Sequence, residues 1–115
     1  MAQQGLTHAE QAVLMWSILV SAARNQQIIS YAAIEGFAGI DRTSQNLALG
    51  LIRSHCQRHS WPLLSCLVVS QVTGLPGDGL PEDMTPIQIM LEQAKIFVFD
   101  WSGHDKPLPA DLQAD

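Results

Sequence analysis

The chain has 115 residues, of which 47% are hydrophobic and 15% charged, and its formal net charge is −5 at pH 7. This length and apolar content are typical of one globular domain and exclude a disordered chain. No apolar run reaches the roughly 18 residues that cross a bilayer, and no basic segment precedes an apolar one at the N-terminus. We therefore expect neither a membrane protein nor a signal peptide. The two cysteines fit reduced thiols better than a disulfide framework, which favours a cytoplasmic protein.

The first predicted helix begins after a capping box, in which Thr7 and Glu10 each accept a hydrogen bond from the other's backbone N–H. The helix is expected to extend from His8 to about Arg24, where a polar run at 25–27 ends it. Apolar residues at helical spacing mark its core side, widened by three more: Val13, Trp16, Val20 and Ala23, with Leu14, Ile18 and Leu19.

A short strand and a short second helix are predicted next, at 28–30 and 31–36. In this second helix Ile34 is expected to face inward, together with Phe37 just beyond it. The glycines and the aspartate of 36–41 then predict a turn. A short helix, a turn and a longer helix have the spacing of a helix-turn-helix.

The longer third helix is expected to be capped by Thr43 or Ser44 and to end at Pro62, because proline lacks an N–H group and its ring clashes with the preceding turn. Three apolar residues at spacings of three and four mark the side that faces the core: Leu49, Ile52 and Cys56.

The charge of the chain is unevenly distributed. Residues 42–77 contain three arginines and no acid, whereas residues 78–115 contain eight acids and two lysines. Because arginine and lysine neutralise phosphates, the third helix is the expected nucleic-acid-binding element. The candidate contact residues lie on this helix and in the loop beyond it: Arg42, Ser44, Gln45, Asn46, Arg53, Gln57, Arg58 and Gly77.

The apolar, β-branched run at 63–70 predicts a buried strand, and the glycine-rich run at 74–79 predicts a loop that serves as a wing. The expected fold is mainly α with a small β component. It is a winged helix-turn-helix with an extra C-terminal helix, formed by a single domain at 1–101 and followed by a flexible tail at 102–115.

The extra helix begins at Thr85-Pro86, a capping residue followed by proline at the first helical position. Its expected core stripe has helical spacing: Ile87, Met90, Leu91, Ala94, Val98 and Trp101. Three further apolar residues then face outward: Ile89, Ile96 and Phe99. Two arrangements would cover these additional apolar residues. Either the outward residues form the interface of a homodimer, or the first helix covers them within a monomer.

Four stretches carry a resemblance to a known family: Trp16-x-Ile18, IISYAAI at 28–34, Ala48-Leu49, and SCLVV at 65–69 with the glycine loop that follows. In this order they resemble the DNA-binding domain of alkylguanine DNA alkyltransferases, whose motifs are a tryptophan helix, "TYG-x-IA", "AVGRAL" and "PCHRVV" before a wing. The resemblance covers residues 13–79. It implies a winged helix-turn-helix whose recognition helix grips the minor groove. In that family the cysteine of "PCHRVV" takes the alkyl group, and alkyltransferase-like relatives without it only bind.

The sequence departs from this family at the reactive cysteine. Ser65 stands in place of the proline, and Leu67 alone replaces the His-Arg pair. A cysteine nucleophile needs a base or a positive environment to raise its thiolate fraction. Without the histidine, Cys66 is expected to be a small core residue, and we expect no enzymatic activity.

A metal site is not expected either. His55, Cys56 and His59, together with Cys66, have the residue types of a zinc site. However, adjacent residues on a helix point about 100° apart, and a structural site needs four convergent ligands. The two histidines are therefore expected to face solvent or a groove, and no cofactor is expected.

Two classes of function remain. The first is a non-catalytic DNA-binding protein of alkyltransferase-like shape, favoured by the charge of residues 42–77. The second is a protein-interaction winged helix, an adaptor or small inhibitor, which would use the apolar helix at 86–101 and the acidic C-terminal third against a basic partner. Of the two, we favour duplex DNA as the partner.

Overall fold

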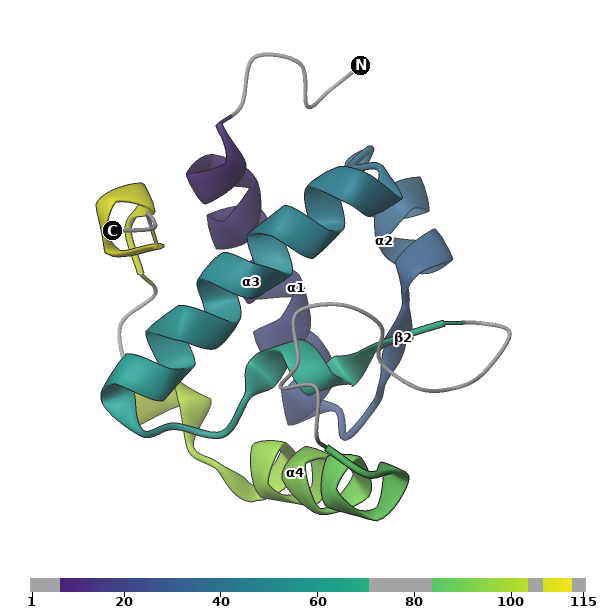
Figure 1. Ribbon diagram of the computed structural model, residues 1–115, viewed down its shortest axis with the longest axis vertical. Coiled ribbons are helices and arrows are strands. Elements are labelled where there is room, and N and C mark those ends of the chain that lie inside the picture. Colours follow the sequence, from purple (N-terminus) through teal and green to yellow (C-terminus); the bar gives the residue numbers. More distant parts are fainter. Residues whose placement is uncertain (1–6, 71–83, 104–106, 113–115) are drawn as a thin grey trace.

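The computed structural model describes residues 7–70, 84–103 and 107–112 (Figure 1). The chain is mainly helical with one small sheet. Its α-helices and strands are, in chain order, α1 His8–Arg24, β1 Ile29–Ser30, α2 Tyr31–Ala38, α3 Arg42–His59, β2 Val68–Val69 and α4 Pro86–Val98. Three short 3-10 helices complete the described residues: η1 Leu64–Leu67, η2 Trp101–Gly103 and η3 Pro109–Leu112.

Helix α1 begins at the predicted capping box. The Glu10 carboxylate accepts from the Thr7 N–H at 2.8 Å, and the Thr7 hydroxyl accepts from the Glu10 N–H at 3.1 Å. The buried apolar side is turned slightly from the predicted one, because Val13 and Val20 are only half-buried. Its buried apolar residues lie at spacings of three and four: Ala9, Ala12, Met15, Trp16, Leu19 and Ala23.

Helices α2 and α3 are joined by a turn of three residues, 39–41. Gly39 ends α2 in the left-handed region with φ 71°, a conformation that costs glycine little. The cap of α3 is Asp41 rather than the expected Thr43 or Ser44. Its carboxylate accepts from the Ser44 N–H at 2.8 Å, which places the predicted caps inside the first turn.

The inward side of α2 consists of Tyr31, Ile34 and Ala38, which are all buried. Ile34 therefore faces the core as predicted. Phe37 does not, since it is 75% exposed at the edge of this side.

The run at 63–70 is buried as predicted, but only its end is a strand. Residues 64–67 form the 3-10 helix η1, and β2 pairs in parallel with β1, so that Ile29 lies opposite Val68 and Ser30 opposite Val69. Parallel strands need a long crossover connection. Helices α2 and α3 lie between the two strands in the chain and supply this connection.

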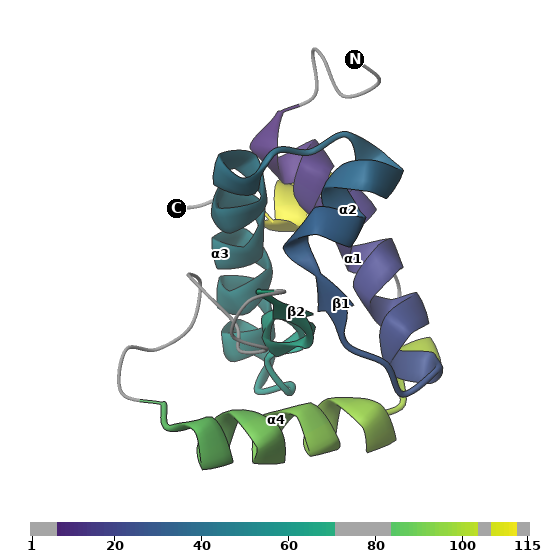
Figure 2. The ribbon, with the colours of Figure 1, turned by 90° about the vertical axis from the view of Figure 1, so that its right-hand side faces the viewer.

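Helix α4 lies across one end of the molecule (Figure 2). The side that it turns toward the core is the opposite of the predicted one. Ile89 and Ile96, expected outward, are buried, whereas the stripe expected in the core is exposed except for Trp101. Phe99 is half-buried and packs against the core.

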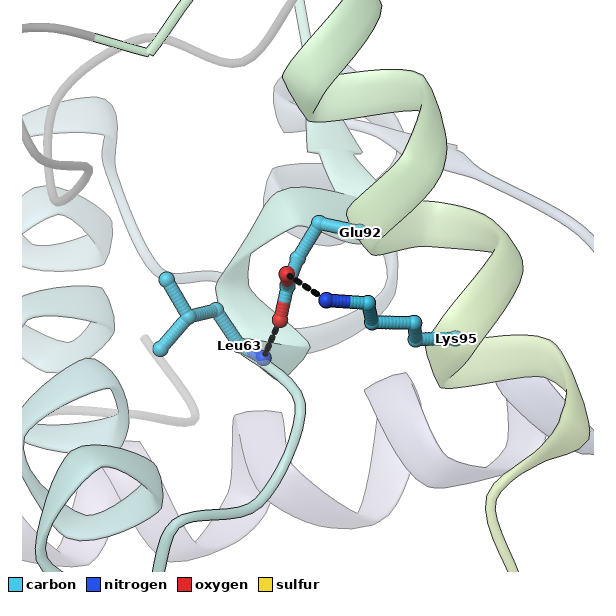
Figure 3. A network of polar contacts seen from close by, with 3 residues as sticks. All are labelled: Leu63, Glu92 and Lys95. Carbon is cyan, nitrogen blue, oxygen red and sulfur yellow. Dashed lines mark hydrogen bonds and ion pairs between the residues drawn. The ribbon is translucent and has the colours of Figure 1, made fainter.

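Polar side chains explain this orientation. Glu92 accepts from the backbone N–H of Leu63 at 2.7 Å and lies 3.8 Å from the ammonium of Lys95 (Figure 3). Gln93 donates to the backbone carbonyl of Cys66 at 2.9 Å. The side of α4 that faces the core is the one that satisfies backbone groups of 63–67.

Part of the segment expected to be a flexible tail packs against the core. Leu112 is fully buried. The segment is also held by α3, because Arg58 donates to the backbone carbonyl of Asp111 at 2.8 Å. Since a fully buried residue lies beyond position 101, the packed unit extends past the predicted boundary.

Candidate nucleic-acid interface

One side of α3 carries a polar stripe. Its members lie at spacings of four, four, three and four residues, which place them along one side of a helix. We call them the α3 stripe: Arg42, Asn46, Gly50, Arg53 and Gln57. Arg42 and Gln57 are exposed and the other three are half-buried. Four of the eight predicted contact residues therefore lie together on one surface.

The two arginines of the α3 stripe differ in their surroundings. The Arg42 guanidinium lies over the Tyr31 ring, 3.7 Å from its centroid, and this cation–π contact fixes it near the start of α3. The Arg53 Nε is buried and has no hydrogen-bond partner among the residues that the structure describes. A buried donor without an acceptor is costly, and the Arg53 side chain would have to turn outward for its guanidinium to bind an anionic oxygen of a partner.

One acidic group lies close to this stripe. A hydrogen bond from the Ser44 backbone N–H, and a second from its hydroxyl, lower the pKa of the Asp41 carboxyl below its usual value. Asp41 is therefore ionised at neutral pH, next to Arg42 in the chain. Its charge reduces the positive potential at this end of α3.

The other predicted contact residues lie elsewhere. The prediction for Gln45 is wrong, because its side chain is fully buried and donates to the backbone carbonyls of Tyr31 at 3.0 Å and Ile40 at 2.8 Å. Arg58 is exposed on another side of α3, held by the C-terminal segment. Ser44 also falls outside the α3 stripe, about 200° around the helix from Arg42. Gly77, in the predicted wing, lies outside the described residues.

An aromatic cluster at the other end of α3 was not predicted. It joins six rings from α1, α3 and the segments around them: Trp16, His55, His59, Trp61, Phe99 and Trp101. His59 stacks on Trp61, with centroids 4.4 Å apart and planes 19° apart. The sequence does carry a signal, since a histidine pair four apart precedes a tryptophan, but no local rule joins these rings to Trp16 and Trp101.

His55 is buried rather than facing solvent or a groove as expected, with 6% of its surface exposed. Burial lowers its pKa, and the positive charges of His59 and Arg58 lower it further. The backbone carbonyl and the carboxylate of Asp111 act weakly in the opposite direction. His55 is therefore neutral at pH 7.

Both thiols are buried. Burial raises the pKa of Cys66 to about 12, with smaller contributions from the charges of Glu92 and Cys56, and raises that of Cys56 to about 11. At neutral pH neither thiol forms the thiolate that a nucleophile requires. Cys66 thus has the surroundings of a core residue.

A groove of about 650 Å³ lies between α1 and η2. Trp16, Trp101 and Arg24 are among its lining residues, and no carboxylate, histidine or cysteine lines it within the described chain. No three histidine, cysteine or acidic side chains approach closely enough to hold a metal ion in that same part of the protein. The groove therefore lacks the usual acid–base groups.

Within the described ranges, no helix has the length and apolar content needed to span a membrane. Comparisons with protein-family models, with curated proteins and with solved structures give no match to this chain.

Proposed function

We propose that this chain is a non-catalytic DNA-binding domain of alkyltransferase-like shape, a winged helix in which α3 contacts the duplex. The α3 stripe carries this proposal. It places Arg42 and Arg53 on the same surface as the amides of Asn46 and Gln57, in the part of the chain that has no acid. The expected wing at 74–79 lies outside the described residues.

The chemistry of the α3 stripe suits a nucleic acid. Guanidinium groups bind phosphate oxygens and position a protein on the backbone, and amides both donate to and accept from base edges. At 18 residues α3 is about 27 Å long, so the stripe is long enough to contact several nucleotides. The resemblance to alkyltransferases favours the minor groove.

The net charge of −5 limits affinity, because non-specific binding depends on phosphate neutralisation. With two arginines in contact, the logarithm of the binding constant should fall against the logarithm of the salt concentration with a slope of about −1.8. Arg58, held by the C-terminal segment, is not counted in this slope.

Titration of a labelled duplex across a salt series tests the proposal. Arg53→Ala should weaken binding and reduce the slope by about 0.9, which corresponds to one lost phosphate contact. Arg24→Ala is the matched control, because it removes the same charge from an exposed residue at the end of α1. It should leave the slope unchanged.

Two results would contradict the proposal. Equal losses in the two variants would mean that overall charge, and not the α3 stripe, governs binding. Absence of duplex binding at low salt would remove DNA as the partner.

The buried Cys66 supports binding without alkyl transfer, since its high pKa leaves almost no thiolate at neutral pH. Self-alkylation of the native protein by alkylguanine DNA would contradict this part of the proposal.

A protein-interaction role is the second candidate, and the exposed apolar side of α4 favours it. The expected attraction to a basic partner has less support. Among the acids of the C-terminal third, Glu92 already binds Leu63 and Lys95, and five lie outside the described residues.

A further inference from the structure

The outer side of α4 is apolar along its whole length. Its residues lie at spacings of three, one, three and four, so they form one stripe. We call them the α4 stripe: Ile87, Met90, Leu91, Ala94 and Val98. The four larger side chains are 71%, 65%, 59% and 84% exposed, in chain order. Figure 2 shows this helix across one end of the molecule, with all the other labelled elements on one side of it.

Such an arrangement is unusual for an exposed helix. A surface helix normally buries its apolar side and turns charged residues outward. Here Glu92 faces the core and binds Leu63, while Ile87 and Val98 at the two ends of the helix face outward. A continuous apolar stripe of this kind marks an interaction surface.

We propose that the α4 stripe pairs with the same stripe of a second copy of this chain, antiparallel across a two-fold axis near residues 92 and 93. This register places Leu91 opposite Ala94 of the second copy, and Ile87 opposite Val98. A large side chain then meets a small one at the centre, which lets two helices approach closely. Both copies contribute the same residues, so the contact closes as a dimer.

Charge favours a second copy over a strongly basic partner. Helix α4 has one acid and one base, so two copies of it bring no net like charge together. Glu92 is held on the inner side, which leaves no acid in the α4 stripe to attract a basic chain. In the proposed register Lys95 lies beside Met90 of the second copy, where its aliphatic stem can pack.

The size of the surface predicts a weak dimer. Burying four large apolar side chains removes on the order of 100 Å² each from water, or about 800 Å² for both copies. Stable interfaces bury about 1,200–2,000 Å², so we expect a dissociation constant of about 10–1,000 μM.

Sedimentation equilibrium of the full chain over this concentration range tests the proposal. The unmodified chain should shift from monomer to dimer, and Leu91→Glu should weaken association about 100-fold. Each dimer loses two leucines, each worth about tenfold. Phe37→Glu is the control, since it changes an exposed apolar residue on α2 and should leave association unchanged. Circular dichroism checks that both variants are folded.

The register has its own test. A mixture of Leu91→Cys and Ala94→Cys chains should form a disulfide-linked heterodimer faster than either variant forms a homodimer. The native thiols do not interfere, because Cys56 and Cys66 are buried. Three results would overturn the proposal: a monomer at every concentration, a dimer that Leu91→Glu leaves intact, or equal cross-linking of all pairs. A monomer that binds a basic peptide through α4 would assign the surface to a different partner.

Discussion

Some polar residues of α3 are buried and stabilise the fold, whereas others face the surface, and residue type alone does not distinguish the two groups. Gln45 and Gln57 have the same chemistry, yet Gln45 is fully buried and joins α3 to the carbonyls of Tyr31 and Ile40, whereas Gln57 faces outward. A buried amide that satisfies backbone carbonyls stabilises the turn between α2 and α3. Both glutamines were predicted as surface contacts, because the sequence does not show how deeply each position is buried.

Gly50 is the residue of the α3 stripe with the clearest test. It lies in the middle of a helix, where glycine costs about 0.5–1 kcal/mol relative to alanine, and an added Cβ would meet nothing within 4 Å. Gly50→Ala should therefore stabilise the protein by about that amount, measured by urea denaturation. If a duplex approaches α3 closely, the same change should weaken DNA binding.

Gly36→Ala provides the matched control for this prediction. Gly36 is also helical with open space around it, but it lies on α2 and outside the α3 stripe. It should stabilise the protein and leave DNA binding unchanged. Stabilisation in both variants with unchanged binding would show that the duplex does not contact α3 near Gly50.

At the scale of elements, the starts of α1 and α4 were predictable from the sequence, whereas the orientation of α4 was not. Thr7 with Glu10 and Thr85 with Gln88 form capping boxes within four residues of chain, so the sequence contains all that fixes them. The orientation of α4 depends on Leu63 and on other distant backbone groups. A helix that is apolar on two sides has no local signal for which side is buried.

The candidate interface was likewise predictable only in part. The charge of residues 42–77 made α3 the candidate element, and the helical period brings Arg42, Asn46, Arg53 and Gln57 together. The hydrogen bond from Arg58 to the backbone carbonyl of Asp111 could not be predicted, because Asp111 lies 53 residues further along the chain.

The hydrogen bond of Glu92 gives a test of how α4 is held. Glu92→Ala leaves the part-buried N–H of Leu63 without this acceptor, which should lower the free energy of unfolding by about 1–3 kcal/mol. Lys95→Ala removes the other partner of Glu92, an ion pair with an exposed ammonium worth at most about 1 kcal/mol. Thermal unfolding should therefore distinguish the two variants. Equal, small losses would mean that Ile89 and Ile96 alone dock α4.

Across the whole molecule, the aromatic cluster joins parts of the chain that lie far apart in sequence. Trp16 of α1 lies 5.5 Å from the His55 ring and 5.7 Å from that of Trp101, measured between centroids. The cluster thus connects the first helix, the end of α3 and the segment after α4. The cluster lies away from Arg42 at the start of α3. A substitution in the cluster can therefore change the stability of the protein without altering that end of the proposed DNA contact.

His55 makes this cluster sensitive to acid. Its folded pKa is lowered by burial and then by His59 and Arg58, so between the ordinary value of about 6.5 and that lower value the unfolded chain binds a proton that the folded protein does not. The free energy of unfolding should therefore fall as pH falls below about 6.5. His55→Phe, which keeps an aromatic ring, should flatten this dependence in urea denaturation between pH 7 and 5. His8→Phe changes an exposed histidine of α1 and should keep the dependence. If His55→Phe retains the full acid dependence, another group titrates, and the histidine is only a packing element of the cluster.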